Sequence, residues 1–119
     1  MRYTNTQRIQ KILLISEQLK IYLKTNNISE EMIKNDLTLQ WTVTTPLYNI
    51  GEHVYNISSD FKEKYSTIPW NRISGLRHRL VHDYEGTNWN IICQVLFQDL
   101  PSFIEQLTIV LKKEQLGNE

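Results

Sequence analysis

The sequence predicts an all-α fold, an up-and-down helical bundle of about five helices. Apolar residues recur at intervals of three and four along most of the chain, which is the period of a helix with one buried face. No segment shows the alternation of a half-buried strand or the turn residues of a hairpin. The 119 residues are 40% hydrophobic and 22% charged, an ordinary composition for one globular domain.

The first helix is predicted over residues 5–25. Its apolar stripe keeps a helical rhythm, with Ile9, Ile12, Leu13, Ser16, Leu19 and Leu23. Thr25, Asn26 and Asn27 end this helix, because such residues favour caps and turns. Ser29 is then a suitable cap for a short second helix over residues 29–35.

A long helix is predicted over residues 36–58, and it carries two apolar stripes. One consists of Val43, Leu47, Ile50, Val54 and Ile57, and the other of Leu37, Trp41, Thr44, Tyr48, Gly51 and Tyr55. Apolar residues over so wide an arc predict burial on more than one side, against the core or a dimer partner. Pro46 predicts a kink, and Gly51 indicates close approach by a neighbouring helix.

The second half of the chain begins with a break at residues 58–60 and a helical turn over 61–65. Pro69 starts a helix over 69–83 with the stripe Ile73, Leu76 and Leu80, and Gly86 permits its left-handed cap. Thr87 or Asn88 caps the last helix, which Pro101 kinks or splits with Asp99 as a new cap. We expect one domain over residues 1–114 and a flexible tail over 115–119.

Composition limits the function classes. The formal net charge is zero, so the chain lacks the overall basic field of a nonspecific nucleic-acid binder, and any RNA contact requires a local patch. Cys93 is the only cysteine, and its apolar neighbours predict a buried packing role in a reducing compartment. No apolar run is long enough to span a membrane, and the N-terminus lacks a signal peptide, which favours the cytoplasm.

The helix over 69–83 carries a cluster of cationic residues, namely Arg72, Arg77, His78, Arg79 and His82, with no acidic residue before Asp83. An arginine offers a planar fork of donors to a phosphate, and a histidine transfers protons near neutral pH. His82 would remove the proton of an RNA 2′-hydroxyl, and Arg77 would stabilise charge on the phosphate. These residues point about 140° apart on a straight helix. They converge only across a groove, at a bent helix end or with a second copy, which favours a symmetric dimer.

Other interpretations of these residues stay open. An arginine or histidine on a helix is most often a solvated surface group. His78 and His82 stand four apart and suit a metal pair, although no zincin pattern surrounds them and the only further histidine is His53. Glu52 is either exposed or pairs with an arginine of residues 72–79 and orients it.

Several short motifs carry a resemblance to a known family. They are Ile50-Gly51-Glu52, Ile68-Pro69-Trp70, Arg77 followed by His82 and Tyr84, Trp89, Ile91-Ile92 and Asp99-Leu100-Pro101. The order resembles the HEPN superfamily signature Arg-x4-His, and more narrowly the Arg-x4-His-x-Tyr form of its HepT-like branch. The resemblance covers roughly residues 36–111. One departure is His78, where many relatives carry asparagine.

The resemblance implies a metal-independent endoribonuclease, the toxin of a toxin–antitoxin pair, that acts without a cofactor as a homodimer. Its implied partner is a minimal nucleotidyltransferase antitoxin. Arg77 and His82 would be catalytic, His78, Glu52 and Arg79 would support them, and Tyr84 would accept AMP from the partner. Asp83 would be a surface or cap residue. The alternative is a noncatalytic nucleotide- or RNA-binding module that docks a nucleotidyltransferase, as some HEPN relatives do.

Overall fold

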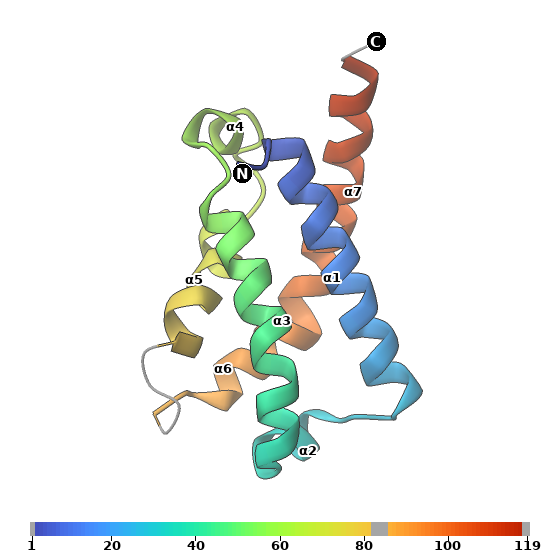
Figure 1. Cartoon of the computed structure of the whole chain (residues 1–119), viewed down its shortest axis with the longest axis vertical. Coiled ribbons are helices and arrows are strands. Elements are labelled where there is room, and N and C mark those ends of the chain that lie inside the picture. The colour runs from blue at the N-terminus through green and yellow to red at the C-terminus, as the bar shows by residue number, and fades with distance from the viewer. Residues whose placement is uncertain (1, 82–85, 118–119) are drawn as a thin grey trace.

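The structure is a computed structural model that describes residues 2–81 and 86–117, apart from the side chain of Val81. In these two ranges every regular element is helical, which confirms the all-α prediction (Figure 1). The elements are α1 (Asn5–Thr25), α2 (Glu30–Asn35), α3 (Leu37–Tyr55), α4 (Ser59–Lys64), α5 (Trp70–Val81), α6 (Trp89–Gln94), the π-helical segment η1 (Val95–Asp99) and α7 (Leu100–Gly117).

Side-chain caps set where five of these helices begin. Thr4, Ser29, Asp36, Ser58 and Asn88 each accept a hydrogen bond from a backbone N–H in the first turn that follows. These bonds satisfy amide groups that have no partner inside the helix. The predicted caps at Ser29 and Asn88 are therefore confirmed, and α3 begins one residue later than predicted because Asp36 is its cap.

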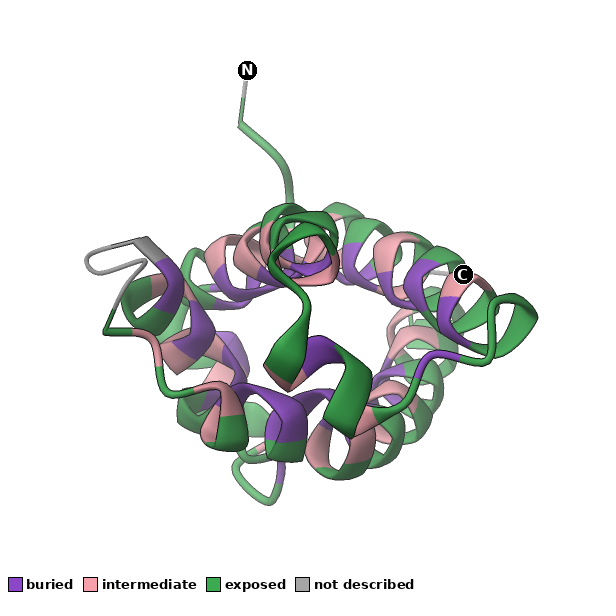
Figure 2. Ribbon diagram, turned by 90° about the horizontal axis from the view of Figure 1, so that it is seen from below, coloured by how far each residue is buried: buried purple, intermediate pink, exposed green. Residues whose placement is uncertain are grey.

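The buried stripes predicted for α1, α3 and α5 face a common interior. Ile12, Ile50, Ile73, Leu76 and Phe103 are among the side chains with no exposed surface. Seen from below, the buried residues turn inward from the surrounding helices (Figure 2). Cys93 lies in this core as predicted, and burial raises the pKa of its thiol to about 11, so the thiol is protonated at neutral pH.

The contact between α3 and α5 is close because α3 carries a glycine there. A Cβ atom on Gly51 would lie 2.8 Å from the backbone nitrogen of Arg77 and 3.3 Å from the Cβ of Leu76. Only a residue without a side chain permits this approach, so the predicted role of Gly51 is confirmed. The backbone of Arg77 is thereby held directly against α3.

The second stripe predicted for the long helix is not buried in the single chain. Leu37, Trp41 and Tyr55 are 55–60% exposed, and only Gly51 of that stripe is fully buried. The helix also continues through Pro46 and ends at Tyr55, three residues earlier than predicted. Periodicity identified the apolar side correctly, but within this chain that side faces outward.

The C-terminal part differs from the prediction in two ways. Instead of a new cap at Asp99, α6 passes into α7 through η1, in which the amide of Leu100 bonds to the carbonyl of Val95. The wider turn directly precedes Pro101, whose ring would crowd the carbonyl four residues earlier in a regular α-helix. The helix also runs to Gly117, three residues beyond the predicted end of the domain at residue 114. Among the described residues, no helix has the length and apolar content needed to cross a membrane.

Candidate active site

The candidate site is built on α5, whose first turn is firmly anchored. The indole Nε1 of Trp70 donates to the carbonyl of Tyr65 at 3.1 Å, and its ring meets Phe103 edge-on at 5.9 Å between centroids. Ile73 and Leu76 are fully buried against the core. The cationic side chains lie off this buried stripe and reach the surface. The sequence therefore separates α5 into a packing face and a chemical face.

Arg77 is held by a carboxylate on the neighbouring helix. Its Nε donates a short hydrogen bond to Oε2 of Glu52, and both side chains remain more than a third exposed. This confirms the predicted pairing of Glu52 with an arginine of α5. The hydrogen bond to Glu52 is the main cause that raises the pKa of Arg77, so the guanidinium stays charged. Glu52 engages Nε, and within the described residues the terminal guanidinium nitrogens form no hydrogen bond, so they are placed to meet a ligand.

A tyrosine ring orients the same guanidinium. The Cζ atom of Arg77 lies 4.2 Å from the centre of the Tyr55 ring, a cation–π distance. Tyr55 was expected to pack in the long helix, and its contact with the site was missed. A signal was present, since Tyr55 lies three residues after Glu52 and thus on the same face of α3. Glu52 and Tyr55 together fix the position and the plane of the Arg77 side chain.

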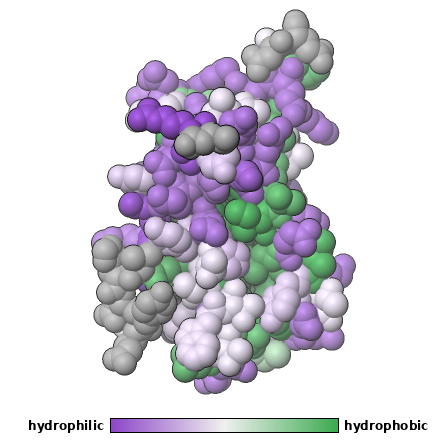
Figure 3. Space-filling model, in the orientation of Figure 1, coloured by the Kyte–Doolittle hydropathy of each residue, from purple (hydrophilic) through white to green (hydrophobic). Residues whose placement is uncertain are grey.

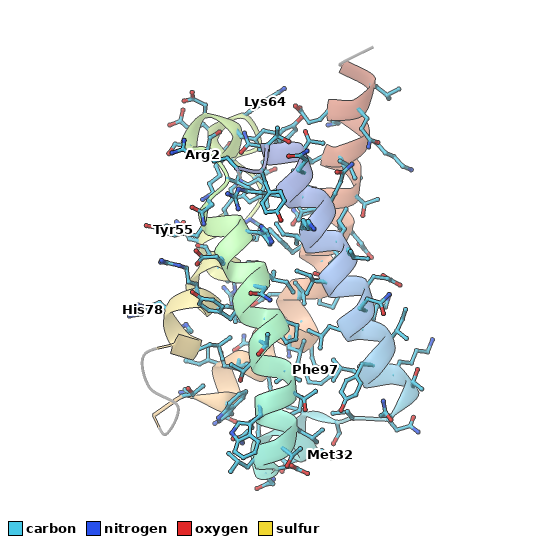
Figure 4. The ribbon with its side chains drawn as sticks, viewed as in Figure 1. Arg2, Met32, Tyr55, Lys64, His78 and Phe97 are labelled. Carbon is cyan, nitrogen blue, oxygen red and sulfur yellow. The ribbon has the colours of Figure 1, made fainter. Side chains whose placement is uncertain are left out.

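Within the described part of α5, the other predicted cations do not gather around Arg77. The Nε of Arg72 forms an ion pair with Oδ2 of Asp99 at 2.8 Å, which ties α5 to η1 and occupies this arginine. His78 and Arg79 are exposed, and they point about 100° and 200° away from Arg77 around the helix. His78, Tyr55 and Arg2 project from one edge of the molecule (Figure 4).

The remaining predicted site residues are His82 and Tyr84, and like Asp83 they lie outside the described residues. The convergence of Arg77 with His82 and the metal pair of His78 with His82 therefore stay predictions. Among the described residues, no group of three or more His, Cys, Asp or Glu side chains is placed to hold a metal ion. The described part provides an arginine that side chains of α3 orient and that remains partly exposed.

Comparison with known proteins identifies the family. The family model described as "Ribonuclease HepT-like" matches residues 5–110, which is most of the chain. A protein of Caldanaerobacter subterraneus subsp. tengcongensis named "Putative RNase" is 35% identical over 92 residues, covering 77% of this chain and 82% of that protein. No solved structure matches this chain.

Archaeal relatives agree with this result. A "Putative RNase" of Methanocaldococcus jannaschii is 33% identical over 74% of this chain and 73% of its own length. A "Probable ribonuclease HepT" of Thermococcus cleftensis is also 33% identical, over 66% of this chain and 71% of its own length. With the helical bundle and the oriented arginine, these matches show that the chain belongs to the HepT-like ribonuclease family, a family of RNA-cleaving enzymes.

Proposed function

We propose that this chain is a metal-independent endoribonuclease and the toxin of a toxin–antitoxin pair. The observation that carries the proposal is the Arg77 guanidinium, which Glu52 and Tyr55 orient while the side chain remains 39% exposed. A planar guanidinium held in this way can donate hydrogen bonds to the two nonbridging oxygens of a phosphodiester. Family membership supports RNA as the substrate.

The reaction we propose uses His82 and Arg77 in separate roles. His82 removes the proton from a ribose 2′-hydroxyl, and the 2′-oxygen attacks the adjacent phosphorus. Arg77 stabilises the charge that develops on the phosphoryl oxygens. The bond from phosphorus to the 5′-oxygen breaks, and that oxygen takes up a proton. The products are a 2′,3′-cyclic phosphate and a 5′-hydroxyl, and no step requires a metal or a cofactor.

A homodimer would complete the site. The exposed side of α3 carries Leu37, Trp41 and Tyr55, and Tyr55 itself contacts Arg77. Burial of these side chains against a second copy would place the two Arg77 side chains on either side of one interface. Arg77 and His82 of the two copies would then line a shared cleft. A second copy would thus bring together two kinds of side chain that point apart on a single helix.

The proposed partner is a minimal nucleotidyltransferase antitoxin, and the pair would act on cytoplasmic RNA. Transfer of AMP to the hydroxyl of Tyr84 would place a phosphate two residues from His82. That anion would pair with the cations of the site and take the space of the RNA phosphate. His78 and Arg79 would support the site as exposed cations near the substrate.

A cleavage assay in the presence of EDTA tests this function. We expect the purified chain to cut single-stranded RNA and leave 2′,3′-cyclic phosphate ends with the chelator present. Loss of cutting on chelation would instead support a His78 and His82 metal site. Binding of RNA without any cutting would support the noncatalytic binding module.

A further inference from the structure

A second group of cations lies where the start of α1 meets the end of α3. We define it as the His53 cluster, made of Tyr3, Arg8, Lys11 and His53. Nη1 of Arg8 lies 3.2 Å from Nδ1 of His53, and the Tyr3 ring meets the His53 ring edge-on at 5.6 Å. Arg8 Cζ and Lys11 Nζ lie 5.6 Å and 5.4 Å from the centre of the Tyr3 ring.

The fold holds this cluster in place. The side chain of Asn5 donates to Oγ of Ser58 at 3.0 Å, and the backbone nitrogen of Ser58 donates back to Oδ1 of Asn5 at 3.0 Å. Thr4 and Gln7 form a capping box that fixes the first turn of α1. The start of α1 is thus tied to the turn after α3. Arg8 and Lys11 stand three residues apart, on one face of α1.

The charge of the cluster is positive and not balanced by a carboxylate of its own. An arginine only donates hydrogen bonds, so Nδ1 of His53 accepts and the imidazole is neutral. Burial, and then the charges of Arg8 and Lys11, lower the pKa of His53, in agreement with this form. Within the described residues neither Arg8 nor Lys11 forms an ion pair, and the acid that faces His53 is Glu52, which already binds Arg77.

The cluster adjoins the candidate site through consecutive residues of α3. Glu52 holds Arg77 from α5, and His53 holds Arg8 from α1. Side chains of consecutive residues diverge by about 100° around a helix. The two guanidinium groups therefore flank the last turn of α3. The face shown in Figure 3 is hydrophilic around the start of α1 and over α4.

We propose that the His53 cluster is a phosphate-binding subsite for the RNA strand beside the cleaved bond. This inference rests on the proposed ribonuclease function. The chain has no net charge, so its affinity for a polyanion must come from unpaired local cations near the reacting phosphate. Arg8 and Lys11 bind backbone phosphates of one strand, while Arg77 binds the phosphate that reacts. His53 positions Arg8 through the bond to Nδ1.

The test compares two pairs of charge-removing substitutions on α1. Both are made in the His82→Ala background so that the RNA stays intact, and binding of a labelled single-stranded 12-mer is measured from 50 to 200 mM salt. Arg8→Gln with Lys11→Gln should weaken binding about tenfold and reduce the salt slope by roughly 1.4, or about 0.7 for each lost phosphate contact. Lys20→Gln with Lys24→Gln removes the same charge about 18 Å further along α1 and should leave binding unchanged.

Further measurements distinguish failure of the subsite from misfolding of a variant and from failure of the proposed ribonuclease function. Lys11→Arg should retain tight binding, because it keeps the charge, and thermal unfolding shows whether each variant is folded. If both double variants bind RNA as tightly as the parent, or if both weaken RNA binding equally, the subsite is refuted. Cleavage by the unsubstituted chain shows separately whether the proposed function holds. A chain that neither binds nor cuts RNA would overturn both proposals.

Discussion

Glu52 on α3 accepts a hydrogen bond from Nε of Arg77 on α5, and the residue before Glu52 is the glycine that lets these helices touch. The same short segment of α3 therefore supplies both the close approach and the acid that orients the arginine. Packing and chemistry are coupled at this point. The first two predictions test the role of the acid and the role of the close approach separately.

Glu52→Gln should lower kcat/KM for RNA by about tenfold, or roughly 1.4 kcal/mol. The amide keeps the size of the side chain but loses the charge that holds Nε of Arg77. Because the pair is more than a third exposed, we expect little change in the free energy of unfolding. Steady-state kinetics and urea unfolding check both parts. Equal kinetics for variant and parent would show that Glu52 does not position Arg77.

Gly51→Ala should destabilise the fold by roughly 1–3 kcal/mol, as expected for overpacking. The new Cβ would meet the backbone of Arg77 at 2.8 Å, and the backbone cannot move aside as a flexible side chain does. Gly75→Ala on α5 is the matched control, since its Cβ would meet nothing within 4 Å. That control should raise the free energy of unfolding by up to about 1 kcal/mol. Urea unfolding that ranked the two variants in the reverse order would contradict the helix contact.

His53 should make stability depend on pH below neutrality. Burial and the cations Arg8 and Lys11 lower the pKa of His53 in the folded chain from its ordinary value of 6.5, against a smaller opposing effect of Glu52. As pH falls through 6.5, the unfolded chain binds a proton that the folded chain does not, so the free energy of unfolding falls. His53→Gln should reduce this fall when unfolding is compared between pH 7.5 and pH 5.5. An identical pH dependence in the variant would contradict the burial of a neutral imidazole.

Trp41→Glu should weaken the proposed homodimer. The Trp41 side chain is 60% exposed in the single chain, so the substitution leaves the core intact. In a dimer that covers this side of α3, it would bury a charge without a partner. Sedimentation at micromolar concentration should show a dimer for the parent and a monomer for the variant. A monomeric parent protein would contradict the proposed cleft shared by two copies.

The sequence predicted the packing faces well because periodicity reports directly on burial. The stripe Ile73, Leu76 and Leu80 and the close approach at Gly51 both have a local sequence cause. For the second stripe of α3 the sequence left the choice between core and dimer partner open, because periodicity identifies an apolar side without showing what covers it. Contacts between distant helices, such as Arg8 with His53, depend on tertiary geometry that no local pattern encodes.

The π-helical segment η1 is a further feature that local patterns did not predict. Pro101 predicted either a kink in the last helix or a split with a new cap at Asp99. In the structure the helix widens instead, and Asp99 pairs with Arg72 on α5. This partner lies 27 residues away in the sequence, so no local pattern could predict the pairing.

Cleavage of single-stranded RNA in EDTA by three matched variants tests the central claim most directly. Arg77→Ala and His82→Ala should each lower the rate roughly 10²–10⁴-fold, the usual contribution of a group that transfers a proton or stabilises developing charge. Lys112→Ala, which removes one exposed positive charge from α7, should cleave like the unsubstituted chain. Full activity of a folded His82→Ala or Arg77→Ala protein would contradict the assignment of this site.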